Sequence, residues 1–266
     1  MEPLLLPQTI TSESVTKNRA KIIIEPCYPG YGTTLGNALR RVLLSSLPGA
    51  AVVAVKIEGV DHEFSTIPFV KEDVVDILLN IKQLRLKVHS NEDVTFKFEA
   101  TGEKIITAAD IKGNSDVEVM STDLHIATLT DKKAKFNIEF TCRQGRGYVT
   151  VENRDSEKYD IGVIAMDAIY SPVQRVGYTV EDVRVGQITN YDKLTLDIET
   201  DGSISPLDAV KQASSVLIDH FQVITGESTK TEPDEAEAPA ELEEVAVTEQ
   251  VTDKSPKKRG RPKKEV

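Results

Sequence analysis

The segment from residue 30 to residue 49 limits the fold of this 266-residue chain more than any other, because a glycine-rich turn there leads straight into a short amphipathic helix. Thr33 or Thr34 is expected to accept a hydrogen bond from the free amides at the helix start, and Pro48 to follow its end. The spacing predicts a helix over residues 35–46. Its apolar face consists of Leu35, Ala38, Leu39, Val42 and Leu43.

Three further residues of this helix lie beside the apolar face rather than on it: Arg40, Arg41 and Leu44. A helix of this kind can pack on its own chain with one face and present a charged edge to another protein. The residues before the turn, Lys21 to Glu25, are typical of a short buried strand. We therefore interpret the segment as an interface helix that follows a strand.

A strand, glycines and a helix in this order also occur in dinucleotide-binding proteins, which carry the pattern G-x-G-x-x-G. Gly30 and Gly32 fit this pattern, but its third glycine position holds Leu35 and the next glycine is Gly36. A phosphate-binding loop that ends in Gly-Lys-Ser/Thr is also absent from the sequence. The spacing thus argues against a nucleotide site.

Alternation of apolar and polar residues predicts half-buried antiparallel strands in several places. These stretches are residues 52–58, 84–88, 94–99, 136–142 and 194–198. Between them, Val74, Ile77, Leu78 and Ile81 mark an amphipathic helix. Strands and helices that mix without regular alternation indicate an α+β fold.

A second helix is predicted over residues 205–225 by its end signals. Ser205 can cap it with Asp208 three residues later, Pro206 suits its first position, and Gly226 can close it. Its apolar stripe consists of Val210, Ala213, Leu217 and Phe221.

Composition and length are those of a globular body of one large or two smaller domains, since 39% of residues are hydrophobic. Cys27 and Cys142 are far apart and lack metal-ligand spacing, so we expect two buried thiols. No apolar run resembles a membrane span, and residues 1–7 lack the features of a signal peptide. A cytoplasmic protein without membrane contact is expected.

Residues suited to catalysis are scattered. His62, His89, His125 and His220 have no nucleophile or carboxylate at the spacing of a triad or metal site. The carboxylates near residue 72 are interpreted as a solvated helix end. The sequence predicts no catalytic, cofactor or metal residue in this chain.

The charge balance favours protein partners. The chain carries a net charge of −11, and residues 227–266 hold eleven acidic against eight basic residues, a balance of −3 that leaves about −8 on the remainder. So acidic a body is a poor general binder of nucleic-acid phosphates. Residues 227–252, rich in Glu, Ala, Pro, Thr and Val, are expected to be a disordered acidic linker.

The sign of the charge reverses in residues 253–266. Their centre, Arg259, Gly260, Arg261 and Pro262, resembles an AT-hook, in which arginines extend along the narrow minor groove of A·T-rich DNA. The alternative is a plain basic tail that solvates the chain or binds phosphate without sequence preference.

Several blocks, in order, resemble the alpha subunit of bacterial-type RNA polymerase over roughly residues 5–226. The longest and most specific is Gly32 to Gly49. The shorter ones are Glu72 to Lys82, Thr107 to Asp110, Gly145 to Val149, Tyr170 to Val173, and Asp192 to Leu194. Most bacterial alpha subunits continue into a folded, DNA-contacting C-terminal domain, and nothing after Gly226 resembles one.

The resemblance implies a discontinuous dimerisation domain, residues 1–48 and 175–226, interrupted by a mostly β insert domain, residues 49–174. It places the two apolar helix stripes at a homodimer interface, with Leu35, Leu39, Val42, Leu43, Val210, Ala213, Leu217 and Phe221 as contacts. The alternative is that both stripes fill the core of a single chain. By the same resemblance, Arg41 and Leu44 contact the beta subunit, and Lys82, Val173 and Lys193 contact beta-prime.

The expected function is therefore assembly: a homodimer that recruits the beta and then the beta-prime subunit of DNA-directed RNA polymerase. Catalysis and its Mg²⁺ would belong to those partner subunits. The first alternative is a stand-alone architectural protein that binds DNA through the basic tail. A second alternative, a small-molecule enzyme, lacks a recognisable site.

Overall fold

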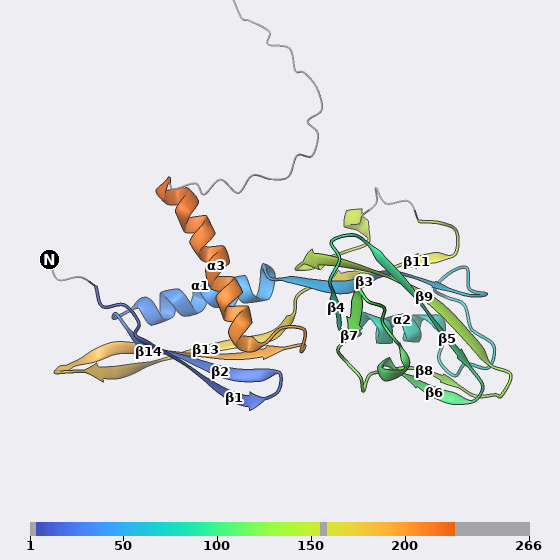
Figure 1. The fold of residues 1–266 in the computed structure, drawn as a ribbon, viewed down its shortest axis with the longest axis horizontal. Helices are drawn as coiled ribbons and strands as arrows, with labels where there is room; N and C mark the ends of the chain where they lie inside the picture. Colours follow the sequence, from blue (N-terminus) through green and yellow to red (C-terminus); the bar gives the residue numbers. More distant parts are fainter. Residues whose placement is uncertain (1–3, 155–158, 227–266) are drawn as a thin grey trace, which may run out of the picture. The chain divides into compact units, whose positions relative to one another are not determined.

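The computed structural model describes residues 4–154 and 159–226 (Figure 1). Antiparallel sheets and helices are mixed in it, which confirms the α+β class. The elements form two main hydrophobic cores, each built around its own sheet. The predicted linker and basic tail, residues 227–252 and 253–266, lie outside the described residues.

The first sheet has the strand order β1-β2-β14-β13, and all its pairings are antiparallel. Two helices that contact each other, α1 and α3, contribute to its core, and α3 crosses α1 in the view of Figure 1. The bounds are β1 Thr9–Thr16, β2 Arg19–Cys27, β13 Val173–Val185, β14 Ile188–Thr200, α1 Tyr31–Ser45 and α3 Pro206–Thr225.

Period-2 alternation explains why this sheet has a buried face. Ile22 of β2 and Leu194 of β14 are completely buried, and they share a core with Leu43 of α1 and Ala213 of α3. Complete burial of one such leucine or isoleucine stabilises the fold by about 1.5–3 kcal/mol. The core thus joins both ends of the described chain.

The second sheet has the strand order β5-β9-β3-β4-β7, with β11 paired to β3, and the helix α2 contributes to its core. Two-stranded pairs β6-β8 and β10-β12 accompany it. The bounds are β3 Pro48–Ile57, α2 Val74–Lys82, β4 Leu86–Val88, β5 Val94–Thr101, β6 Lys104–Thr107, β7 Val117–Val119, β8 His125–Leu129, β9 Lys135–Arg146, β10 Tyr148–Val149, β11 Val163–Ala165 and β12 Ala168–Ile169. Short 3₁₀ helices span Ala108–Asp110 and Glu152–Arg154.

The cap prediction for the first helix was wrong. The helix begins at Tyr31 rather than residue 35, and its N-cap residue is Gly30, with φ 84°, which has no side chain to cap it. Thr34 Oγ1 instead donates to the carbonyl of Gly30, 3.2 Å away. The helix ends at Ser45, and Ser46 N donates to Val42 O to close it.

The second helix confirms its end signals. Ser205 Oγ accepts a hydrogen bond from Asp208 N at 3.2 Å, Pro206 opens the helix, and Gly226 closes it with φ 80°. Both cysteines are buried and free, as expected. Within the described residues, no helix is long and apolar enough to cross a membrane.

Candidate assembly surfaces

The start of α1 is held by a buried carboxylate. Asp192 lies on β14 and is 7% exposed, and its Oδ2 accepts hydrogen bonds from Gly30 N and Gly32 N, both at 2.9 Å. A negative charge at a helix N-terminus also interacts favourably with the helix dipole. Asp192 therefore accepts hydrogen bonds from amides at the helix start, the role that the sequence predicted for Thr33 or Thr34.

Gly32 and Gly36 let helix α1 pack closely on the hairpin formed by β13 and β14. A Cβ atom on Gly36 would lie 2.7 Å from the ring of Tyr178 and 2.9 Å from the side chain of Leu194. A Cβ on Gly32 would lie 2.9 Å from Asp192. The glycine spacing thus serves helix packing. Two amides at the start of the helix, those of Gly30 and Gly32, already donate to Asp192.

The face of α1 opposite its core carries the residues that the resemblance linked to the beta subunit. Leu39 and Leu43 are buried in the core of the first sheet, whereas Arg41 is exposed and Leu44 is 38% exposed. The backbone oxygen of Leu44 accepts a hydrogen bond from Ser171 Oγ at 3.2 Å. The helix therefore has one buried face and one free face with a charge and an apolar side chain.

The eight residues expected at a dimer interface divide into three groups. Four are buried in the chain's own core, which is the alternative that the sequence left open: Leu39, Leu43, Val210 and Ala213. Three are half-buried against that core: Leu35, Val42 and Leu217. Phe221 is 60% exposed. Their role at an interface stays a prediction.

The apolar stripe of α3 continues past the end of the chain's own core. Helical spacing places Phe221 and Ile224 on the same side as Ala213 and Leu217, yet Phe221 is 60% and Ile224 79% exposed. Neighbouring Ile218 and Val223 are also exposed. The last two turns of α3 thus present an apolar surface, which we call the α3 tip: Ile218, Phe221 and Ile224.

Lys82, expected to contact beta-prime, is engaged within its own chain. Its Nζ lies 3.0 Å from Asp167 Oδ2, and Tyr148 OH donates to the same oxygen at 2.9 Å. The hydrogen bond from Lys82 lowers the pKa of Asp167, with further contributions from Val151 N and Tyr148. The same contact with Asp167 raises the pKa of Tyr148. The ammonium group of Lys82 is therefore held in a fixed position by Asp167, in a cluster that is partly exposed.

Val173 and Lys193, the other two residues expected to contact beta-prime, lie far apart. Val173 starts β13 and is 4% exposed, so its side chain lies in the core of the first sheet. Lys193 on β14 pairs in register with Glu181 on β13, eight residues from Val173. At about 3.3 Å per residue, the two positions are roughly 26 Å apart along the hairpin.

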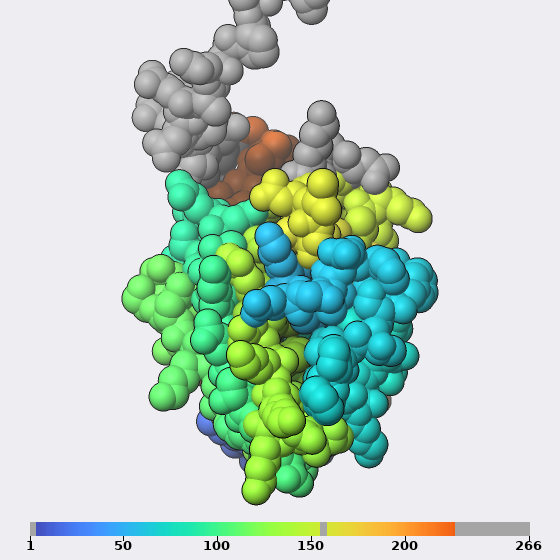
Figure 2. All heavy atoms as spheres, turned by 90° about the vertical axis from the view of Figure 1, so that its right-hand side faces the viewer, coloured from blue at the N-terminus to red at the C-terminus, as the bar shows by residue number. Residues whose placement is uncertain are grey.

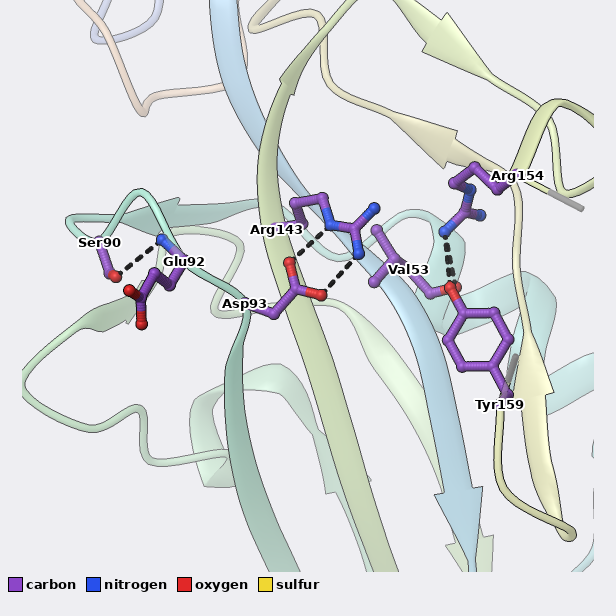
Figure 3. A network of polar contacts seen from close by, with 7 residues as sticks. All are labelled: Val53, Ser90, Glu92, Asp93, Arg143, Arg154 and Tyr159. Carbon is purple, nitrogen blue, oxygen red and sulfur yellow. Dashed lines mark hydrogen bonds and ion pairs between the residues drawn. The ribbon is translucent and has the colours of Figure 1, made fainter. Parts of the chain in front are cut away.

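Two arginines near β3 act as structural anchors (Figure 3). Arg143 of β9 makes a two-pronged contact with Asp93, with Nε to Oδ1 at 2.5 Å and Nη2 to Oδ2 at 2.6 Å, and this contact lowers the pKa of Asp93. Arg154 is buried and donates to Tyr159 OH at 3.2 Å and to the carbonyls of Val53 and Met166. Both ties hold strands and loops of the second sheet together.

The carboxylates near residue 72 differ from the solvated helix end that the sequence predicted. Glu72 accepts hydrogen bonds from Thr128 N at 2.7 Å and Thr128 Oγ1 at 2.9 Å, and His125 Nε2 lies 3.0 Å from it. Asp73 caps α2 by accepting from Asp76 N. Across residues 4–154 and 159–226, no cluster of His, Cys, Asp or Glu could hold a metal ion.

The middle of the chain matches a known protein family. Residues 55–171 match the family model described as the RNA polymerase Rpb3/RpoA insert domain. This part of the chain is therefore an insert domain of that type, and it lies inside the expected segment 49–174. The match supports an RNA polymerase subunit of the Rpb3/RpoA type, which takes part in polymerase assembly. The outer boundaries of the two domains stay a prediction.

Proposed function

We propose that the protein is the alpha subunit of a bacterial-type DNA-directed RNA polymerase, a cytoplasmic homodimer that recruits the beta and beta-prime subunits. The match over residues 55–171 carries the proposal, because RNA polymerase subunits of the Rpb3/RpoA type take part in polymerase assembly. The chain itself contributes surfaces rather than chemistry. Among the described residues, its free surfaces include the exposed face of α1 and the α3 tip.

The test is affinity purification of the tagged full-length chain from its native cell at moderate salt. Recovery of two very large polymerase subunits in stoichiometric amounts is expected. Recovery of chromosomal DNA without these subunits would instead favour the architectural DNA-binding protein.

Removal of the Arg41 side chain is expected to weaken recruitment of the beta subunit while the fold is kept. Arg41 lies on the free face of α1, so Arg41→Ala removes no core contact. Loss of one member of a buried charged pair at an interface costs roughly 2–5 kcal/mol, which is more than tenfold in affinity. Titration of the purified variant against the beta subunit measures the effect.

Arg40→Ala is the matched control for Arg41→Ala, because it removes the same charge from the neighbouring exposed position of α1. Recruitment by the control should stay close to that of the unmodified protein. Equal affinities for all three proteins would make Arg41 an ordinary solvent-facing arginine.

We further propose that residues 253–266 assist contact with A·T-rich DNA. Arg259, Gly260, Arg261 and Pro262 support this through their resemblance to an AT-hook. The acidic charge of the rest of the chain means that such a tail would add to polymerase function rather than replace it.

Deletion of residues 254–266 is expected to leave polymerase assembly intact and to reduce affinity for A·T-rich duplexes. The lost component should fall steeply with salt, because Lys and Arg release counterions from phosphates. Arg261→Ala should reduce binding to A·T-rich DNA more than Lys264→Ala. Salt-titrated binding to A·T-rich and G·C-rich duplexes of equal length tests this, and equal affinities would leave only a plain basic tail.

A further inference from the structure

One turn of the matched domain places a bulky residue in a backbone conformation that favours glycine. Val70 N donates to Ile67 O at 3.2 Å, which closes a turn with Pro68 and Phe69 at its centre. Phe69 has φ 64°, and among the described residues it is the one non-glycine with positive φ. A turn with proline first and a positive-φ residue second is the type II arrangement, which normally takes Gly or Asn at the second position.

Local packing does not account for this choice of residue. Phe69 is 50% exposed, so this large apolar residue is only partly covered by its own chain. A left-handed backbone brings the Cβ of any L-residue too close to its neighbouring carbonyl, and a bulky residue there is a genuine outlier. Glycine would satisfy the same turn without that strain.

Hydrogen bonds to strand β8 and the residue after it hold the turn in this conformation. Thr130 N and Oγ1 both donate to Phe69 O, at 2.9 and 3.0 Å. Lys71 N donates to Thr128 O at 3.0 Å, and Thr128 N donates back to Glu72 at 2.7 Å. The backbone on both sides of Phe69 is therefore fixed, and the ring is held at the surface.

We propose that Phe69 is an anchor residue that inserts its ring into an apolar pocket on a partner subunit of RNA polymerase. Strained residues that the surroundings hold in place are typical of binding sites, and rigid aromatic side chains often dominate protein interfaces. The turn lies within the matched insert domain of a class that assembles with other polymerase subunits. This inference rests on the proposed function.

The surroundings of the turn suit such a contact. Figure 2 shows the segment between β3 and α2, coloured blue to cyan, spread over the surface of one face of the molecule. The same segment carries Phe64, which is largely exposed.

The test compares Phe69→Gly and Phe69→Asn in the full-length chain, because both residues accept positive φ and neither has a ring. Both variants should keep or raise the melting temperature. In competition with the unmodified protein for purified large polymerase subunits, both should bind about tenfold or more weakly. Ile188→Asn, which removes a comparably exposed apolar side chain from β14, should compete normally.

Three results would overturn the proposal. A clear fall in melting temperature for Phe69→Gly would mean that the ring is needed by the chain's own fold. Stable variants that compete as well as the unmodified protein would leave Phe69 without a binding role, although the proposed function would stand. Failure of the unmodified protein to recruit any polymerase subunit would remove the proposed function itself.

Discussion

Phe221→Asp is expected to convert the proposed homodimer into monomers that stay folded. Phe221 is 60% exposed in the single chain, so the substitution disturbs little of its own core. In a dimer that covers the α3 tip, the new carboxylate would be buried without a partner, at a cost of roughly 3 kcal/mol or more. Light scattering at micromolar concentration measures the mass, and circular dichroism follows the fold.

Two substitutions show whether this effect belongs to the α3 tip. Ser215→Asp adds the same charge to the opposite side of α3 and should leave the dimer intact. Leu39→Asp places the charge in the chain's own core and should unfold the protein rather than separate two folded copies. A monomeric unmodified protein at micromolar concentration would refute the dimer.

Helices with local end signals could be predicted from the sequence. The helix α3 begins after Ser205 and ends before Gly226 because its cap and its closing glycine are neighbours in sequence. The apolar residues of α2 also fall where the spacing placed them, with Val74, Ile77 and Ile81 buried. Such signals depend on residues that are close in sequence, so they can be recognised without knowledge of the fold.

Features that depend on contacts between distant residues could not be predicted. The cap of α1 comes from Asp192, some 160 positions away in sequence, and the local threonines were chosen in its place. The strands β1 and β13 were not predicted, because β1 is exposed throughout and β13 has irregular burial. Whether an apolar stripe fills its own core or a partner's was equally open. In α3, Val210 and Ala213 are buried in the chain's own core, Leu217 is half-buried against it, and Phe221 is exposed.

The candidate surfaces were predicted in part. The two faces of α1 follow from spacing, and the structure leaves Arg41 and Leu44 free as that spacing suggests. The partners of Lys82, Tyr148 and Asp167, were missed, since no local pattern joins them. Phe69 was missed because the sequence shows a Pro-Phe pair and not the sign of φ.

Three of the sequence blocks that carried the resemblance, those with Gly49, Gly145 and Tyr170, meet in one packing contact. Its ring lies against Gly145, where a Cβ would approach within 2.6 Å of a ring carbon. Its backbone oxygen lies where a Cβ on Gly49 would be, at 1.8 Å. Gly49 and Gly145 pair in register on β3 and β9, so together they form the slot that receives Tyr170.

Gly49→Ala is therefore expected to destabilise the protein more than any surface substitution. The new methyl group would meet the backbone oxygen of Tyr170, which cannot rotate away as a side chain can, so strand β3 and the backbone just after β12 must move apart. We expect a loss of about 3 kcal/mol or more in the free energy of unfolding. Gly177→Ala on β13 is the matched control, because a Cβ there meets nothing within 4 Å, and it should change the free energy by less than about 0.5 kcal/mol. Urea titration followed by circular dichroism measures both, and equal midpoints for the two variants would show that the Tyr170 slot is looser than the structure has it.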